Sequence, residues 1–252
     1  MLAFNEADKI ADSLASARAC PWCDELLVFD SGSTDDTVAI AERYADRVEH
    51  HDWVDFTTNR RLLTDSATND WIFLLDADEQ VTPELANEIA ALTNTKFKNH
   101  PVMTMPRRNY LLGKHVRAWD PDRINRLFDR RRVTWPERSI HDTRIPTEGT
   151  ENRLSNPILH NANVSYFTDY FDGPRYAKRA EALAREMYDQ GRRVGFVGLW
   201  LRPWVAFIKF YFLKRGFIDG TFGLMIAQKA AFSVQLKYAY LWYLQQNEEK
   251  GE

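Results

Sequence analysis

Short apolar runs that end on aspartates alternate with helical patterns through the first hundred residues. The apolar run 26–29 leads into Asp30 and a turn at 31–33, after which apolar residues recur at helical spacing. A second apolar run over 71–75 leads directly into Asp76. Each run predicts a buried strand with a carboxylate at its C-terminal end.

The segments between these runs complete the alternation. The pattern predicts a strand over 47–51 and a helix over 57–67, and Thr82 and Pro83 suit the cap and first residue of a further helix. Strands alternating with helices predict an α/β fold that is Rossmann-like, with a mostly parallel central sheet covered on both faces.

The alternation weakens beyond residue 100. Six prolines among short apolar runs over 101–165 predict long loops and edge strands, and the pattern over 168–246 is helical with glycine and proline breaks. We expect a catalytic domain over 1–165 and a helical extension over 166–252.

Composition excludes several classes of protein. With 252 residues, 44% hydrophobic and 27% charged, the chain matches ordinary globular proteins, so a disordered or collagen-like chain is excluded. Two cysteines, Cys20 and Cys23, cannot build a disulfide framework, and no second pair completes a zinc site. No secretory leader opens the chain, and we expect a cytoplasmic protein.

The charges are unevenly distributed. Residues 1–100 hold 8 basic and 20 acidic side chains, whereas residues 174–217 hold 10 basic and 3 acidic ones. The basic segment is also rich in aromatic residues, which is typical of a segment that lies on an anionic membrane surface. Arg202, Pro203 and Lys209 interrupt its apolar stretch over 196–217, so we expect it to lie on the bilayer and not to cross it. A helix packed on the core is the alternative.

Acidic residues follow two of the predicted strands, Asp30 after one and Asp76 and Asp78 after the other. In an open α/β sheet, ligands bind outside the carboxyl ends of the strands. An Asp-x-Asp there can direct two carboxylates toward one hard cation, which suits Mg²⁺ or Mn²⁺ and, through it, a diphosphate.

Three segments carry a family resemblance: 3–6 (AFNE), 28–37 (VFDSGSTDDT) and 74–79 (LLDADE). In order and spacing they resemble the nucleotide-sugar motifs of inverting family-two glycosyltransferases with the GT-A fold. The segments 106–113 (PRRNYLLG), 121–122, 126–128 (RLF) and 213–220 (LKRGFIDG) are similar to those of lipopolysaccharide-core β-1,4-glucosyltransferases.

The resemblance implies roles for the strand-end residues. Asp30 corresponds to the carboxylate that pairs with the uracil ring, with Phe4 and Glu6 beside the base and ribose. Asp76 corresponds to the acid near the ribose and metal, and Asp78 to a metal ligand.

Further residues are implied more weakly. His160 resembles a late histidine that meets the metal or diphosphate, although a structural histidine is the alternative. Arg60 is expected either to meet the diphosphate or to lie on a solvated helix face with Arg61. For the general base, Asp142 stands where the family usually shows Glu, and Asp122, with Asp120 behind it, is the competitor. A purely structural role for either is the alternative.

Four arginines are expected to bind an anionic acceptor, because a guanidinium group engages phosphate or carboxylate with two hydrogen bonds. They are Arg107, Arg108, Arg123 and Arg126.

One feature departs from the family. Related enzymes begin with a hydrophobic strand, whereas only Met1, Leu2 and Ala3 precede the Asn5-Glu6 loop. We expect either a start upstream of Met1 or an unusually short central strand.

Together these features predict a metal-dependent inverting glycosyltransferase on the inner face of the cytoplasmic membrane. It would move a hexose, expected to be glucose from UDP-glucose, to a lipid-linked lipopolysaccharide inner-core saccharide. A polyprenyl-phosphate acceptor is the second possibility, and a non-catalytic basic module that binds membrane or RNA is the third. The acidic strand ends would repel a nucleic acid, so no nucleic-acid partner is expected.

Overall fold

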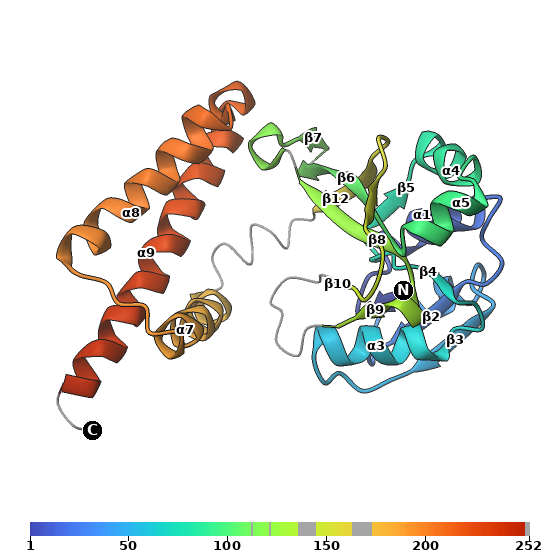
Figure 1. Cartoon of the computed structure of the whole chain (residues 1–252), viewed down its shortest axis with the longest axis horizontal. Helices are drawn as coiled ribbons and strands as arrows, with labels where there is room; N and C mark the ends of the chain where they lie inside the picture. Colours follow the sequence, from blue (N-terminus) through green and yellow to red (C-terminus); the bar gives the residue numbers. More distant parts are fainter. Residues whose placement is uncertain (112, 121, 136–144, 163–172, 250–252) are drawn as a thin grey trace. The chain divides into compact units, whose positions relative to one another are not determined.

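The computed structural model describes residues 1–111, 113–120, 122–135, 145–162 and 173–249. The chain divides into two compact units, which we call the sheet unit (1–108 and 121–161) and the helical unit (109–120 and 162–252). Residues 109–120 group with the helical unit, although they lie within the first of the two predicted domains. Each unit is described by itself (Figure 1).

The first sheet of the sheet unit is parallel and three-stranded. Its strand order is β1 (Leu2–Ala3), β2 (Leu27–Asp30) and β3 (Arg47–His50), and helices α1 (Ile10–Arg18) and α2 (Thr37–Ala41) connect the strands in sequence. All four residues of β2 are buried, as expected of a strand covered on both faces. The predicted α/β class with a parallel sheet is therefore confirmed.

A second, larger sheet contains mostly antiparallel pairs. Its main strand order is β4 (Trp71–Phe73), β8 (Arg123–Asp129), β6 (Val102–Leu111), β12 (Ile158–Ala162), β5 (Glu79–Val81). β7 (Lys114–His115) and β11 (Glu151–Arg153) also pair with β6, and β9 (Val133–Thr134) and β10 (Ile145–Pro146) form a separate pair.

The prediction of edge strands from the prolines over 101–165 is wrong for one strand, β6. The ten-residue β6 contains Pro106, yet it lies inside the sheet between β8 and β12 and not at an edge. Pro106 is opposite Arg123, the first residue of β8. The Arg107 N–H donates to the Asp122 carbonyl oxygen at 2.7 Å, so Arg107 faces β8 and the preceding Pro106 nitrogen faces away from it. The proline therefore removes no hydrogen bond from the pairing of β6 with β8.

Three helices follow β3 and β5: α3 (Phe56–Ser66), α4 (Pro83–Ala90) and α5 (Asn94–Asn99). The Asp55 side chain caps α3 by accepting from the Thr58 N–H at 2.8 Å, and Thr82 caps α4 as predicted, accepting from the Leu85 N–H at 3.2 Å. The helix predicted over 57–67 is confirmed to within one residue at each end. Among the described residues, two short 3₁₀ turns precede residue 145: η1 (Arg117–Trp119) and η2 (Arg130–Arg132).

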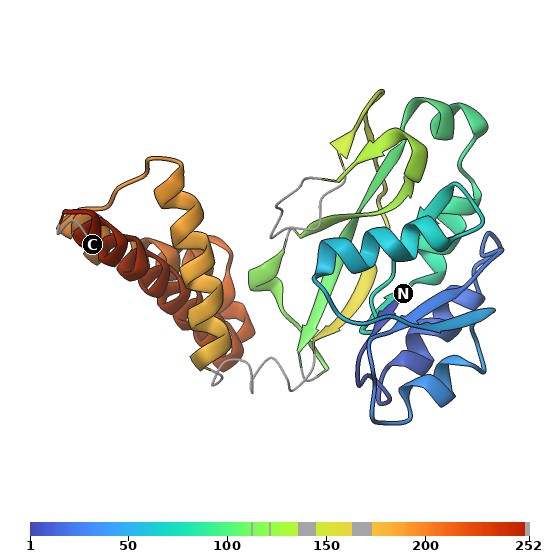
Figure 2. The same cartoon turned by 90° about the horizontal axis from the view of Figure 1, so that it is seen from below.

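The helical unit is built around one long helix, and its elements are α7 (Gly173–Asp189), α8 (Phe196–Ile208), the π-helical η3 (Lys209–Leu213), the 3₁₀ turn η4 (Gly216–Asp219) and α9 (Thr221–Glu249). Both α7 and α8 pack against α9 (Figure 2). A Cβ on Gly223 of α9 would lie 1.7 Å from the Gly216 carbonyl oxygen, so glycine is required for this close approach. The predicted helical pattern over 168–246 is confirmed within the described residues.

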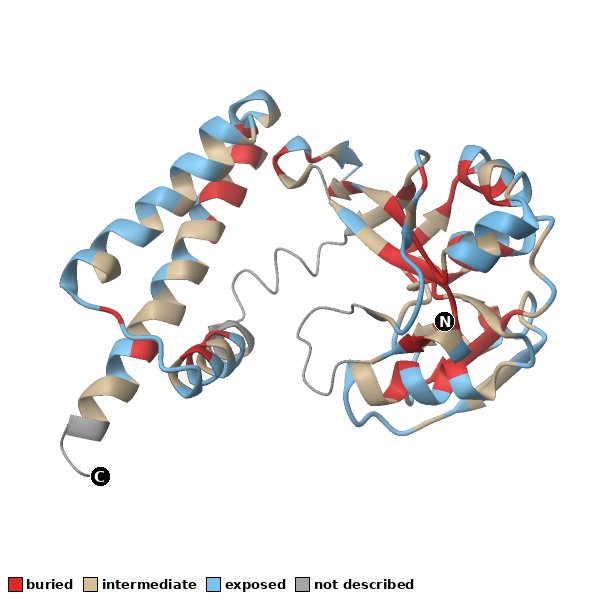
Figure 3. Cartoon of the chain, in the orientation of Figure 1, coloured by how far each residue is buried: buried red, intermediate tan, exposed pale blue. Residues whose placement is uncertain are grey.

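Burial differs sharply between the two units. The sheet unit holds most of the buried residues, whereas none of the residues of α8 is buried (Figure 3). The main core cluster joins α1, β2, β5 and α4 through apolar residues such as Leu14, Val28, Val81 and Leu85. This core holds the strand ends on which the candidate site is built.

Candidate functional site

Two loops at the carboxyl ends of β1 and β2 are joined by hydrogen bonds. Asn5, at φ 54°, accepts from the Thr34 N–H through Oδ1 at 2.8 Å, and its own N–H donates to Ser33 Oγ at 2.8 Å. The Glu6 N–H donates to Thr37 Oγ1 at 2.8 Å. Asn tolerates the left-handed conformation better than most residues. The loop that carries Phe4 and Glu6 is thereby fixed beside the turn that follows β2.

Asp30 ends β2, and its side chain organises that turn. Its Oδ2 accepts from the Gly32 and Ser33 N–H groups, both at 2.9 Å, while Ser33 Oγ donates to its Oδ1. Gly32 has φ +91°, which a residue with a side chain rarely adopts. Asp30 is 4% exposed, whereas Phe4 is 56% exposed. The predicted contact of Asp30 with a uracil ring stays a prediction.

Six side chains of alternating charge form a continuous series next to these loops. We call it the ion chain, and its order is Asp122, Arg107, Glu79, Arg126, Asp76, Arg60. The residues come from β6, β8, α3, the start of β5 and the loops beside these strands. The ion chain therefore links the larger sheet to α3, the helix that precedes β4.

Asp76 is held by two guanidinium groups. Arg60 donates to its Oδ1 at 2.6 Å, and Arg126 donates to its Oδ2 at 2.5 Å. Burial opposes ionisation of Asp76, but the charges and hydrogen bonds of Arg126 and Arg60 outweigh burial and hold the pKa of Asp76 well below its usual range. Asp76 is therefore a carboxylate at neutral pH, and a role as metal ligand requires it to share its oxygens with these arginines.

Glu79 is the most deeply buried member of the ion chain, with no exposed surface. Its Oε1 accepts from Arg126 at 2.6 Å and lies 3.7 Å from Arg107, and its Oε2 accepts from the Asp76 N–H at 3.2 Å. Burial raises the pKa of Glu79, Arg126 opposes that rise, and the neighbouring Asp76 adds to it. Sequence reasoning gave Glu79 no role, because nothing local marks it as different from a solvated acid.

The structure excludes one of the two alternatives for Arg60. Its side chain is 8% exposed and bonded to Asp76, so the solvated helix face is wrong for Arg60, whereas Arg61 is exposed. The predicted contact of Arg60 with a diphosphate stays a prediction.

The arginines expected at the acceptor have varied surroundings. Arg126 is 3% exposed and bonds Asp76 and Glu79, so an acceptor contact by Arg126 is not supported. Arg123 is exposed but donates to the Thr104 and Leu154 carbonyl oxygens. Arg107 pairs with acids of the ion chain, and Arg108 is exposed. Arg108 is thus the best placed of the four to meet a ligand from solvent.

Asp78 and His160 lie side by side. β12 pairs antiparallel with β5 so that His160 is opposite Glu79, and the Asn161 N–H donates to the Asp78 carbonyl oxygen at 2.8 Å. This register places His160 Nε2 3.2 Å from Asp78 Oδ2. Residues 82 positions apart that the sequence singled out for one metal are therefore neighbours. Among the described residues, no three His, Cys, Asp or Glu side chains are grouped to hold a metal ion.

The two candidate bases differ in what the structure describes. Asp122 Oδ2 accepts from Arg107 Nε at 2.8 Å, and its carbonyl oxygen accepts from the Arg107 N–H at 2.7 Å. Asp120 pairs with His115 at 2.9 Å. Asp142 lies outside the described residues, so its prediction as base stays open.

Cys20 and Cys23 are free thiols. Burial raises the pKa of Cys20 to about 12, and burial also raises the pKa of Cys23. Both are therefore protonated at neutral pH.

Comparison with known proteins gives a family. Residues 1–147 match the sequence model of glycosyl transferase family 2. An uncharacterized glycosyltransferase of Rickettsia felis is 25% identical over 248 residues, which cover 94% of this chain and 86% of that protein. The lipopolysaccharide core biosynthesis glycosyltransferase LpsC of Rhizobium meliloti is 23% identical over 260 residues, covering 95% and 92%.

A shorter match is closer in sequence. A TPR repeat-containing protein of Synechococcus elongatus is 40% identical over 90 residues, which cover 35% of this chain and 22% of that protein. The family match spans more than half of the chain and contains Asp30, Asp76 and Asp78. The protein therefore belongs to glycosyl transferase family 2.

Proposed function

We propose that this transferase moves a hexose, glucose, from a nucleotide-sugar donor to an inner-core saccharide of lipopolysaccharide, with inversion at the anomeric carbon. The observation that carries the proposal is the Asp78–His160 pair beside the ion chain, at the strand ends of a family 2 domain. The likeness to LpsC, named for lipopolysaccharide core biosynthesis, supports the acceptor class.

The donor would be held by the loops after β1 and β2. Asp30 would accept from the uracil ring of UDP-glucose, and Phe4, which is 56% exposed, would cover the base together with the Glu6 loop. The hydrogen bonds that join Asn5 and Glu6 to residues 33–37 support this role, because they fix both loops before a ligand arrives.

The residues present fit a divalent cation. Mg²⁺ is commonly bound by one or two carboxylates together with substrate phosphates, so Asp78 and His160 need supply only part of the ligand set. Asp76 would join them by sharing its carboxylate with Arg60 and Arg126. A bound Mg²⁺ or Mn²⁺ would neutralise the charge that develops on the leaving diphosphate.

Inversion needs one carboxylate as a general base. The acceptor oxygen forms a bond to the anomeric carbon as the bond from that carbon to the diphosphate oxygen breaks, and the hydroxyl proton passes to the base. Asp142 and Asp122 are the two candidates. Asp122 is the first member of the ion chain, so its position is coupled to Asp76 through the members between them.

The helical unit would bind the cytoplasmic leaflet that holds the acceptor. Five exposed apolar residues follow one another at intervals of four, which places them on one face of the α8–η3 helix. They form the apolar stripe: Phe196, Trp200, Trp204, Ile208 and Phe212. Over 196–213 the helix is long and apolar enough to cross a membrane by length and composition. The exposed Arg202 and Lys209 within it favour a position on an anionic surface.

The function is tested with a panel of nucleotide sugars. We expect the release of nucleoside diphosphate from UDP-glucose to depend on Mg²⁺ or Mn²⁺ and to increase with lipopolysaccharide inner core as acceptor. Asp78→Asn should abolish release, whereas Asp65→Asn, an exposed acid on α3, should not. Full activity of Asp78→Asn in excess chelator would contradict the proposed site, and activity with polyprenyl phosphate alone would contradict the acceptor.

A further inference from the structure

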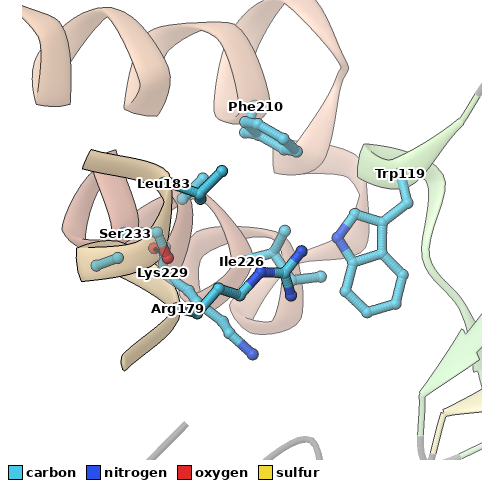
Figure 4. A pocket seen from close by; sticks show the side chains of 9 residues that line it. Trp119, Arg179, Leu183, Phe210, Ile226, Lys229 and Ser233 are labelled. Atoms are coloured by element: carbon cyan, nitrogen blue, oxygen red, sulfur yellow. Dashed lines mark hydrogen bonds between the residues drawn. The ribbon is translucent and has the colours of Figure 1, made fainter. Parts of the chain in front are cut away.

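The helical unit contains a pocket whose lining combines two cations with an apolar wall. The pocket has a volume of about 410 Å³, which lies within the ~300–1,000 Å³ of small-molecule sites. Its wall includes Arg179 from α7, Lys229 and Ile226 from α9, Phe210 from η3 and Trp119 from η1 (Figure 4). All of these residues belong to the helical unit.

The cations indicate the charge of a ligand. Lys229 is only 8% exposed, although lysine is almost never fully buried, and the exposed Arg179 of α7 lines the same pocket. None of the described lining residues is acidic. An anion that entered would meet one exposed cation, Arg179, and one buried cation, Lys229, and a charge-assisted hydrogen bond is stronger where water is partly excluded.

The rest of the wall indicates an apolar body attached to that anion. Leu183, Ile226 and the Phe210 ring line the pocket with the Trp119 indole ring and two alanines. The Ser233 hydroxyl donates to the Lys229 carbonyl oxygen at 2.9 Å, so its oxygen can still accept. A free inorganic anion would leave most of this apolar surface uncovered, whereas an amphiphile would cover it.

We propose that this pocket binds one anionic amphiphile, with its phosphate group at Arg179 and Lys229 and its apolar part against Phe210, Ile226 and Leu183. The site differs from the apolar stripe of α8, where contact with a bilayer would be spread over a helix face. It also does not depend on transferase chemistry, so Asp78→Asn should bind the amphiphile as the parent protein does.

The test is calorimetric titration of the full chain with dihexanoyl phosphatidic acid below its micelle concentration. We expect one molecule to bind per chain. Dihexanoyl phosphatidylcholine and inorganic phosphate should each bind at least about tenfold more weakly, because one lacks the net charge and the other the apolar part. Equal binding of phosphatidylcholine would overturn the role of the cations, and equal binding of inorganic phosphate would overturn the role of the apolar wall.

Variants locate the site. Arg179→Gln and Lys229→Met should each weaken binding about tenfold, equal to ~1.4 kcal/mol. Lys178→Gln removes the same charge from an exposed neighbour on α7 that does not line the pocket, and it should bind normally. If Lys178→Gln weakened binding equally, the anion would be attracted by the overall positive charge of the surface and not by this pocket, and the proposal would be overturned.

A variant that changes no charge tests the same site in case Lys229→Met does not fold. Ala230 lines the pocket, and Ala230→Phe should fill it and abolish binding while circular dichroism stays unchanged. Retained binding in a folded Ala230→Phe would place the amphiphile elsewhere.

Discussion

Replacing Arg126 by Met tests whether the ion chain holds the sheet unit together. Arg126 is 3% exposed and bonds both Asp76 and Glu79. After its removal Asp76 keeps Arg60 at 2.6 Å, but Glu79 has no exposed surface, and Arg107 lies 3.7 Å from it. Removing one partner of a buried ion pair costs ~3–5 kcal/mol, mostly because the other charge stays buried. We expect Arg126→Met to lower the free energy of unfolding by this amount, mainly because the charge of Glu79 stays buried.

Urea unfolding followed by circular dichroism measures the loss. With an m value of ~2 kcal/mol/M, the unfolding midpoint of the sheet unit should fall by about 1.5–2.5 M. Arg131→Met is the matched control, because Arg131 pairs with Asp70 and Asp129 but its side chain is 65% exposed. Exposed pairs contribute ~0–1 kcal/mol, so that variant should unfold close to the parent.

A double variant separates charge from packing. Adding Glu79→Gln to Arg126→Met removes the buried negative charge and should recover ~1–3 kcal/mol of the loss. Should Arg126→Met fold too poorly to measure, Arg126→Lys keeps the charge but replaces the planar guanidinium group with a smaller ammonium group, and it should show a smaller shift. If Arg126→Met costs no more than Arg131→Met, the ion chain contributes nothing to stability and the reasoning is refuted.

Three further predictions concern the base, pH and the membrane. Asp142→Asn should lower turnover by ~10²–10⁴ with unchanged donor affinity; normal turnover in that variant with loss in Asp122→Asn would assign the base to Asp122. The pKa of Asp76 is lowered in the folded protein, so its charge stabilises the folded state at neutral pH, and this stabilisation is lost as the pH falls below the unfolded pKa of ~3.9. In urea unfolding, Asp76→Asn should therefore lower the free energy of unfolding most near pH 7 and progressively less below pH ~4. Trp200→Ser with Trp204→Ser should weaken sedimentation with anionic vesicles about 10²-fold or more, while Trp242→Ser, which is also exposed, should not; equal effects would remove the apolar stripe as the contact.

Strands and helices with strong local patterns were predictable. The run 26–29 is the buried β2, and the Thr82-Pro83 start of α4 is confirmed because a cap depends only on residues within one turn. The edge-strand prediction failed for the strand that contains Pro106, because the cost of a proline depends on which neighbouring strand its missing N–H would face. The Pro106 nitrogen faces away from β8, and this arrangement is set by sheet topology and not by local sequence.

The carboxylates of the site were likewise visible as residues at the ends of apolar runs. Asp30, Asp76 and Asp78 needed only local pattern, whereas the contact of Asp78 with His160 needed the register between β5 and β12. The family resemblance singled out His160 but did not place it in space. In the structure its Nε2 lies 3.2 Å from Asp78 Oδ2.

The sequence by itself determined the strand–helix alternation of the first hundred residues and the acids that follow its strands. Only the tertiary structure decided that Arg60 and Arg126, separated from Asp76 by 16 and 50 residues, enclose that acid, and that Glu79 is buried between arginines. Local pattern reports which side chains are apolar and where the backbone turns. The state of a charge depends instead on which other charges share its low-dielectric surroundings, and those come from strands that meet only when the chain folds.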